Sequence, residues 1–272
     1  MSFSSSFNAF CSQYTKTYRL GKGGCGSVFA GERVADKKLV AIKRVKNPPC
    51  ITFPGGTYSL PREVCLMEIV NRPRRCENVV ELLDWTRIPS SDSVYFLVLE
   101  RPDKCMDLQK FCQLNNGRVS EPQARKIMWQ VVRATHHSFE CGVLHRDIKP
   151  ANLLIDTETQ QVKLIDFGCG DLLKDNPYTS YDGTKEFCPP EWFINRKYSG
   201  YSATVWSLGV LLFGLVSGRL PFNSKEEIIN AQLRFPPGLS GDCCSLISWC
   251  LKKDPEERLP FQQILSHMWF NP

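Results

Sequence analysis

The sequence predicts an α+β protein of two lobes, with a small β-rich N-terminal lobe that holds one main helix and a larger α-helical C-terminal lobe. Short segments with strand-like alternation dominate residues 18–99, and segments with helical periodicity dominate the chain that follows. A short linker joins the two regions. We therefore expect a frayed extension, an N-terminal lobe, a hinge and a C-terminal lobe over residues 1–17, 18–99, 100–105 and 106–272, respectively.

The N-terminal lobe is predicted to contain five strands and one helix. Residues 18–46 hold three short β-rich stretches, the first of which is broken by glycines. Two further strands are expected over residues 79–87 and 94–99. Pro61 suits the first turn of a helix, and the pattern after it places Val64 and Met67 on one helical face.

The C-terminal lobe is predicted to consist mainly of helices. Ser120 is a suitable N-cap for a long amphipathic helix that runs to about Glu140, and Gly142 follows its end. Short apolar stretches predict two small strands. The small strands are expected over residues 153–155 and 162–165, and the remaining helices over about 202–217, 224–232, 242–251 and 260–267.

Length and composition are those of an ordinary globular chain. With 272 residues, of which 42% are hydrophobic and 23% charged, the chain can bury a core without a metal or a disulfide. The net charge of +6 comes from dispersed basic residues, so we expect no nucleic-acid partner. The longest apolar run, residues 206–216, is shorter than the roughly 20 residues that cross a membrane, so we expect no membrane partner.

The thirteen cysteines occur at no C-x-x-C spacing, which favours neither a zinc ribbon nor a secreted disulfide framework. The first residues, MSFSSSFNAFCSQYTK, lack the basic flank and apolar stretch of a signal peptide. We therefore expect reduced thiols and a location in the cytoplasm, extending to the nucleus. A monomer is expected.

A glycine-rich stretch lies between the first two predicted strands. Gly21, Gly23 and Gly26 are followed by Val28 in the pattern G-x-G-x-x-G-x-V. Glycines let the backbone approach a phosphate closely and present N–H groups to its oxygens. Taken alone, the stretch is equally well a glycine-rich hairpin. It does not fit the dinucleotide-binding motif of a Rossmann fold, because a strand follows it instead of a helix.

Lys43 lies in the next predicted strand, two residues after Ala41. Strand alternation places both on one face, where the small residue can form the floor of a pocket and the ammonium group can reach phosphate. A lone lysine is more often a surface residue, but the glycine motif before it favours the phosphate role. Glu63 on the predicted helix is the candidate anionic partner.

The strongest signal is a pair of polar motifs in the C-terminal lobe. Residues 145–152 read HRDIKPAN, and residues 166–168 read DFG after a short apolar strand. In this order, after the glycine stretch and the lysine, these motifs are the signature of protein kinases. Asp147 can accept a proton from a hydroxyl group, and Lys149 can neutralise a migrating phosphoryl group. Asn152 and Asp166 offer oxygen ligands that suit Mg²⁺.

From about residue 18 to residue 270 the chain resembles a eukaryotic protein kinase domain, and more narrowly the Pim family of serine/threonine kinases. The narrower resemblance rests on the stretches LERP (99–102), CGVLHRDIK (141–149), LIDFGCGDLLKD (164–175), PPEW (189–192) and VWSLGVLL (205–212). It implies a bilobal kinase fold, ATP as the phosphoryl donor and Mg²⁺ or Mn²⁺ as the metal. It also implies protein substrates with serine or threonine acceptors.

The resemblance further implies roles for individual residues. Lys43 and Glu63 would form the ion pair beside the nucleotide phosphates, and Lys149 with Thr184 indicates a serine or threonine acceptor. Because Pro102 has no N–H group, adenine would make one hinge hydrogen bond, to the carbonyl group of Glu100. Apolar contacts with adenine are implied for Leu20, Val28, Ala41, Leu99, Leu154 and Ile165.

The resemblance is weaker for substrate selectivity. Pim kinases prefer basic residues before the acceptor and use acidic side chains to bind them. Asp107 remains, but other positions where that family has acidic residues are occupied here by Lys110, Ala151, Arg219 and Lys225. We therefore expect the basic preference to be diluted.

Regulation is expected to follow the resemblance, which implies activity without phosphorylation of the activation segment. An arginine beside the catalytic aspartate commonly needs an anion from that segment. Here Arg146 is the arginine, and Asp171, Asp175 and Asp182 can supply fixed negative charge.

A pseudokinase that binds nucleotide as a scaffold, without catalysis, is the alternative interpretation. Pseudokinases usually lose the catalytic aspartate, the metal-binding aspartate or the strand lysine. Asp147, Asp166 and Lys43 are all present, so the sequence favours an active enzyme.

Arg258 is expected to pair with Glu191, because either charge would be costly to bury alone.

Overall fold

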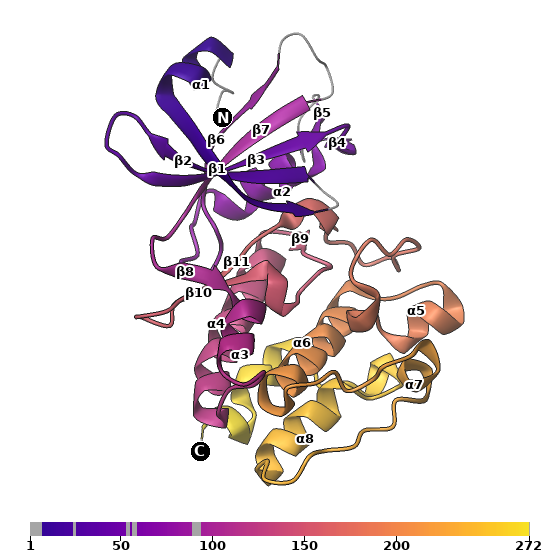
Figure 1. The fold of residues 1–272 in the computed structure, drawn as a ribbon. Coiled ribbons are helices and arrows are strands. Elements are labelled where there is room, and N and C mark those ends of the chain that lie inside the picture. The colour runs from indigo at the N-terminus through magenta and orange to yellow at the C-terminus, as the bar shows by residue number, and fades with distance from the viewer. Residues whose placement is uncertain (1–6, 24–25, 53–54, 56–58, 89–93, 272) are drawn as a thin grey trace.

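The computed structural model describes residues 7–23, 26–52, 55, 59–88 and 94–271, and it has the two lobes that the sequence predicts (Figure 1). The N-terminal lobe contains helices α1 (Phe7–Gln13) and α2 (Arg62–Asn71) and the strands β1 (Tyr14–Gly23), β2 (Gly26–Arg33), β3 (Leu39–Lys46), β4 (Cys50–Thr52), β5 (Ser59–Pro61), β6 (Leu82–Arg87) and β7 (Val94–Glu100).

Five strands of this lobe form one antiparallel sheet in the order β1-β2-β3-β7-β6. In its register, Lys43 of β3 lies opposite Val28 of β2, and Ala41 lies opposite Leu99 of β7. Residues paired across neighbouring strands share a face of the sheet. The register therefore places these four side chains on a single face, as the alternation in β3 predicts.

Helix α2 begins directly after Pro61, whose φ of −48° suits a helix start. The helix buries Val64, Leu66 and Met67, and also the charged residue Glu63. Its apolar contacts reach both the sheet and the C-terminal lobe, because Val64 belongs to one core cluster while Leu66 and Met67 belong to the other. This packing fixes the orientation of Glu63 relative to the sheet.

The C-terminal lobe is mainly helical, with two small sheets of strand order β11-β10-β8 and β12-β9. Its strands are β8 (Cys105–Asp107), β9 (Val143–Leu144), β10 (Leu153–Asp156), β11 (Val162–Leu164) and β12 (Asp171–Leu172). Its α-helices are α3 (Leu108–Leu114), α4 (Glu121–Glu140), α5 (Pro190–Asn195), α6 (Gly200–Ser217), α7 (Lys225–Asn230) and α8 (Gly241–Cys250). Its short 3₁₀ helices span Pro150–Asn152, Phe167–Cys169, Lys185–Phe187, Pro255–Glu257, Phe261–Ser266 and Met268–Phe270.

Helix α6 is the apolar centre of this lobe. It is long and apolar enough to cross a membrane by length and composition, but 78% of its residues are buried inside the protein. A side chain at Gly209 would meet the Cβ atom of Cys250 at 2.7 Å, so the glycine allows α8 to pack closely. Helix α4 also packs on α6. It begins at the predicted cap, where the Ser120 hydroxyl accepts a hydrogen bond from the Gln123 N–H.

The N-terminal extension differs from the expected frayed segment. Residues 1–6 lie outside the described part of the chain, but α1 and the start of β1 are ordered from Phe7 onward. Phe10 and Tyr14 are buried and pack with Val40 and Ile42 in a small cluster on the sheet. Aromatic burial therefore orders a segment that looks polar from its serines.

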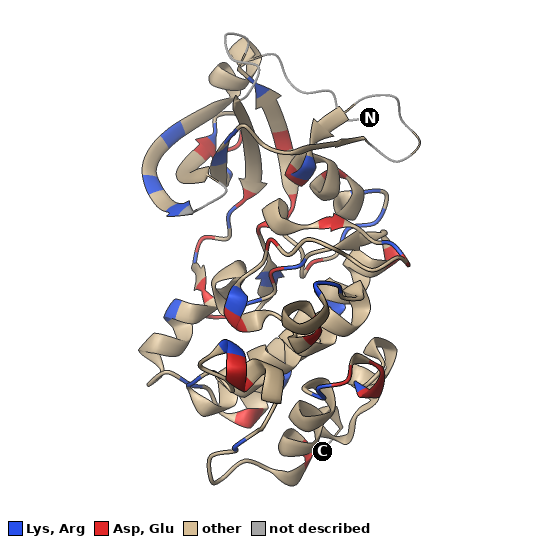
Figure 2. Cartoon of the chain, turned by 90° about the vertical axis from the view of Figure 1, so that its right-hand side faces the viewer, with Lys and Arg blue, Asp and Glu red and all other residues tan. Residues whose placement is uncertain are grey.

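The predicted helices are otherwise confirmed with small shifts at their ends, and the helix expected near residues 260–267 is a 3₁₀ helix, Phe261–Ser266. Helices α1, α3 and α5 and the short strands β4, β5, β8, β9 and β12 were not predicted, so the N-terminal lobe has more elements than the expected five strands and one helix. Basic and acidic residues are scattered over both lobes (Figure 2), in agreement with the dispersed charge in the sequence.

Candidate active site

A cavity of about 380 Å³ lies between the two lobes. Most of the predicted nucleotide-binding residues line it: Leu20, Gly21, Val28, Ala41, Lys43, Glu63, Leu99, Glu100, Leu154, Ile165 and Asp166. Gly26 is not among the described residues that line the cavity, and it pairs with Gly23 at the end of the β1–β2 hairpin. The cavity walls also include Val80, Met106 and Pro102. Val80 and Met106 were not predicted as lining residues, because they belong to no motif and reach the cavity only through the tertiary fold.

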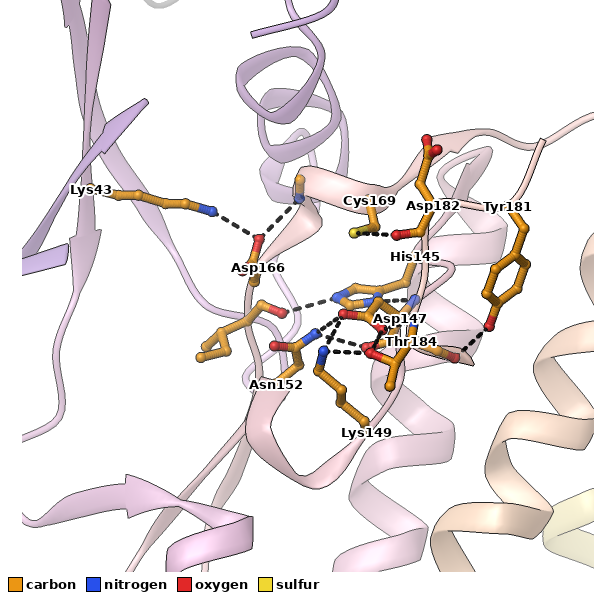
Figure 3. A network of polar contacts seen from close by, with 12 residues as sticks. Lys43, His145, Asp147, Lys149, Asn152, Asp166, Cys169, Tyr181, Asp182 and Thr184 are labelled. Carbon is orange, nitrogen blue, oxygen red and sulfur yellow. Dashed lines mark hydrogen bonds and ion pairs between the residues drawn. The ribbon is translucent and has the colours of Figure 1, made fainter. Parts of the chain in front are cut away.

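Lys43 forms two ion pairs, one with Glu63 within the N-terminal lobe and one with Asp166 of the C-terminal lobe. Its Nζ atom lies 2.6 Å from Glu63 Oε1 and 2.8 Å from Asp166 Oδ1, as Figure 3 shows for Asp166. Both Lys43 and Glu63 are buried. Burial alone would lower the pKa of Lys43, but the charges of Glu63 and Asp166 outweigh it and raise that pKa. The lysine therefore stays charged beside the cavity.

The loop that carries Asp166 is held by Phe167 and His145. Asp166 adopts a left-handed backbone conformation with φ of 64°, which is unusual for a residue other than glycine. Phe167 is fully buried and packs edge to face on His145, with ring centroids 4.7 Å apart. The Nε2 atom of His145 lies 3.0 Å from the carbonyl oxygen of Ile165. These contacts fix the direction in which the Asp166 carboxylate points.

A second polar cluster surrounds Asp147 (Figure 3). Its Oδ1 accepts hydrogen bonds from the N–H and the hydroxyl of Thr184, at 2.9 and 2.6 Å. Its Oδ2 lies 2.8 Å from both Lys149 Nζ and Asn152 Nδ2. Burial alone would raise the pKa of Asp147, but the Lys149 and Thr184 contacts lower it below its ordinary value. The carboxylate is therefore charged and held in one orientation.

Asn152 and Asp166 are arranged so that each keeps an oxygen for a further ligand. The Asn152 amide donates through Nδ2 to the backbone and side chain of Asp147, and its oxygen points away from that residue (Figure 3). Asp166 uses Oδ1 for Lys43 and for the Gly168 N–H. Within the described residues, no group of three or more histidine, cysteine or acidic side chains could hold a metal alone. A metal here would thus complete its shell with ligand and water oxygens.

The activation segment is held by Arg146. The Arg146 side chain is almost fully buried, and its guanidinium donates to Asp182 Oδ2 at 2.9 Å and to the Cys169 carbonyl at 2.6 Å. The same Asp182 oxygen lies 3.2 Å from Arg62 of helix α2. Asp171 lies further from Arg146, at 3.8 Å. Of the aspartates proposed from the sequence, Asp182 therefore makes the direct contact.

The expected pair of Glu191 and Arg258 is confirmed. Two hydrogen bonds of 2.8 and 2.6 Å join the guanidinium to the carboxylate, and both side chains are buried. Arg258 also donates to the backbone carbonyl groups of Ser202 and Lys252 and lies over the Trp206 ring. The pair fastens the end of the activation segment to helix α6.

Residues 14–270 match the family model described as protein kinase domain. The chain is 39% identical over 267 residues to the serine/threonine-protein kinase pim-2 of Danio rerio, which covers 96% of this chain and 85% of that protein. It is 37% identical over 268 residues to the serine/threonine-protein kinase prk-2 of Caenorhabditis elegans, covering 97% of this chain and 59% of that protein. A CBL-interacting serine/threonine-protein kinase 5 of Arabidopsis thaliana is 32% identical over 92% of this chain and 56% of that protein. The chain thus spans little more than half the length of the worm and plant relatives.

Proposed function

The chain belongs to the protein kinase family, whose serine/threonine members it matches, and from this we propose that it transfers the γ-phosphoryl group of ATP to serine and threonine hydroxyls of proteins, with Mg²⁺ and without phosphorylation of its activation segment. The observation that carries the proposal is the simultaneous assembly of both polar clusters. Lys43 contacts Glu63 and Asp166 while Asp147 contacts Lys149 and Thr184.

In this proposal each side chain has a positioning or charge-neutralising role, as phosphoryl transfer requires. Lys43, kept charged and oriented by Glu63, holds nucleotide phosphates in the cavity. Asp147 orients the acceptor hydroxyl and receives its proton. Lys149 neutralises charge on the transferred group. Thr184 holds the Asp147 carboxylate in place through its hydroxyl and N–H groups.

Asn152 and Asp166 would hold the metal, because each presents a hard oxygen ligand of the kind that Mg²⁺ prefers. A bound divalent cation would neutralise negative charge on the phosphate oxygens. Asp166 suits this position because the Lys43 charge and the Gly168 N–H overcome the effect of burial, so its pKa is lowered and the carboxylate stays ionised.

The proposal predicts that the purified, unphosphorylated chain transfers labelled phosphate from ATP to a serine peptide when Mg²⁺ is present. Asp166→Asn should reduce this transfer by at least about a hundredfold, because the metal loses its charged ligand. The measurement is peptide phosphorylation, with nucleotide binding followed separately by calorimetry. EDTA should abolish the transfer, and Mg²⁺ in excess of EDTA should restore it. Nucleotide binding without any transfer by the wild-type chain would instead favour the pseudokinase scaffold.

Asp182 supports activity without phosphorylation, because its carboxylate fills the place of an anion between Arg146 and Arg62. Asp182→Ala should lower kcat about tenfold, since a charge-assisted hydrogen bond, here to the buried guanidinium of Arg146, contributes roughly 1.5–3 kcal/mol. Asp175→Ala is the matched control, because Asp175 is an exposed aspartate of the same segment and should leave kcat unchanged. The measurement is kcat of protein shown by mass spectrometry to carry no phosphate. Equal rates for the two variants would contradict this role.

A further inference from the structure

A second hollow, of about 560 Å³, borders the Asp147 cluster. It shares Lys149 and Thr184 with that cluster and continues between helix α3 and the end of helix α6. Its floor is apolar and includes the buried side chains of Cys112, Phe187 and Leu215. We refer to this hollow as the acceptor groove.

Of the interlobe cavity and the acceptor groove, the groove is the one that can hold the substrate residues on either side of the acceptor serine or threonine. A hydroxyl that gives its proton to Asp147 must lie about 3 Å from that carboxylate, and each further residue extends the chain by at most about 3.6 Å. Because Lys149 and Thr184 touch Asp147 and also line the groove, the neighbouring residues of a substrate enter the groove directly. The interlobe cavity on the other side is filled by nucleotide in the proposed function.

Among the described residues that line the acceptor groove, three carry a charged side chain, namely Lys149, Glu186 and Arg219. Lys149 is already paired with Asp147. Glu186 is exposed and negatively charged, so it does not attract an acidic substrate side chain. Among the described residues, Arg219 makes no ion pair with an acidic side chain, so its charge is available to one from a substrate.

Arg219 is held in position although it is exposed. One of its guanidinium nitrogens donates to the Arg234 carbonyl oxygen at 2.8 Å, and the guanidinium lies 5.3 Å from the centre of the Phe213 ring. These contacts leave other N–H groups of the guanidinium for a ligand, since arginine has five donors in a fixed fork. A planar fork of this kind binds carboxylate or phosphate oxygens in pairs.

We propose that Arg219 is a specificity-determining residue that selects an acidic side chain near the acceptor serine or threonine. This inference rests on the proposed function and names its substrate class: peptides with glutamate, aspartate or a phosphorylated residue within a few positions of the acceptor. An arginine at the same position meets a like charge.

The test measures kcat/KM for serine peptides that carry glutamate, arginine or alanine at each position from four before to four after the serine. At one or more positions, glutamate should exceed arginine by about fivefold, the size of an exposed ion pair. Arg219→Glu should reverse the glutamate-to-arginine ratio at that position, while Arg219→Lys should keep its direction. Lys253→Glu, which changes an exposed cation that does not line the groove, should leave the ratio unchanged. The preference should also shrink at high salt.

The outcomes separate the two claims. If the alanine peptides are phosphorylated but arginine equals or exceeds glutamate at every position, or if Arg219→Glu leaves the ratio unchanged, the role of Arg219 is refuted and the kinase activity stands. If the wild-type chain phosphorylates none of the peptides in the set, the proposed function fails, and the inference fails with it. Because the readout is a ratio between two peptides, a general loss of folding in Arg219→Glu does not mimic a reversal.

Discussion

Asp147→Asn should reduce kcat for peptide phosphorylation by about a hundredfold to ten-thousandfold, the usual contribution of a positioned general base. The four donors that now face its carboxylate come from Thr184, Lys149 and Asn152. An amide presents an NH₂ group to some of these donors and cannot accept a proton from the substrate. Rates from single-turnover phosphorylation, measured alongside nucleotide affinity, would show the effect.

Nucleotide affinity separates this variant from a change at the metal site. Asp147→Asn should bind ATP as the wild type does, because Asp147 does not line the interlobe cavity. Thr184→Ala is a useful companion, since it removes one hydroxyl donor and leaves the base itself, so its loss should be about tenfold. A loss for Asp147→Asn no greater than that for Thr184→Ala would contradict the role of Asp147 as the base.

The lowered pKa of Asp147 predicts how kcat depends on pH. A carboxyl group with a lowered pKa is ionised at every pH above its ordinary value of 3.8. The wild-type kcat should therefore show no decline from this group between about pH 8 and about pH 6. An acid limb near pH 6.5 in wild type that disappears in Asp147→Asn would show that the neighbouring contacts do not hold the carboxylate in its charged form.

The active-site motifs could be predicted from sequence because their chemistry is concentrated in short stretches. The stretches 145–152 and 166–168 place polar groups at spacings that have few other uses. The alternation in β3 likewise predicted that Ala41 and Lys43 share a face, and the register confirms it. The prediction that Glu63 pairs with Lys43 needed one further assumption, namely that the next helix turns Glu63 toward the sheet.

Other features depend on contacts between segments that are distant in the chain, and the sequence could not rank them. Three aspartates of the activation segment were equally good partners for Arg146, and the fold selects Asp182 because Arg62 approaches the same carboxylate from helix α2. The order in residues 7–13 depends on Phe10 meeting the sheet, which no local pattern reveals. Residues such as Val80 enter the nucleotide cavity for the same reason.

Glu191→Ala should lower the free energy of unfolding by about 3 kcal/mol, and Arg258→Ala by about 5 kcal/mol, because each leaves the buried charge of the other residue without its partner. The two effects should differ. When Glu191 is removed, Arg258 still donates to the Ser202 and Lys252 carbonyl groups. When Arg258 is removed, those carbonyl groups and the Glu191 carboxylate all lose the hydrogen bonds that Arg258 donates. The contact with the Trp206 ring is lost as well. Urea unfolding followed by fluorescence would measure both.

Arg33 and Asp36 provide the matched control, since they form the same two-pronged contact at 2.9 and 2.6 Å but are exposed. Asp36→Ala should change stability far less than Glu191→Ala, because solvent screens the pair and hydrates the remaining arginine. The double variant Glu191→Ala/Arg258→Ala should be more stable than the sum of the single changes predicts, because it leaves no unpaired buried charge. Additive effects at positions 191 and 258, or equal effects of Asp36→Ala and Glu191→Ala, would mean that burial does not set the strength of this contact. The activation segment would then be held at its end by packing around Trp206 and not by charge.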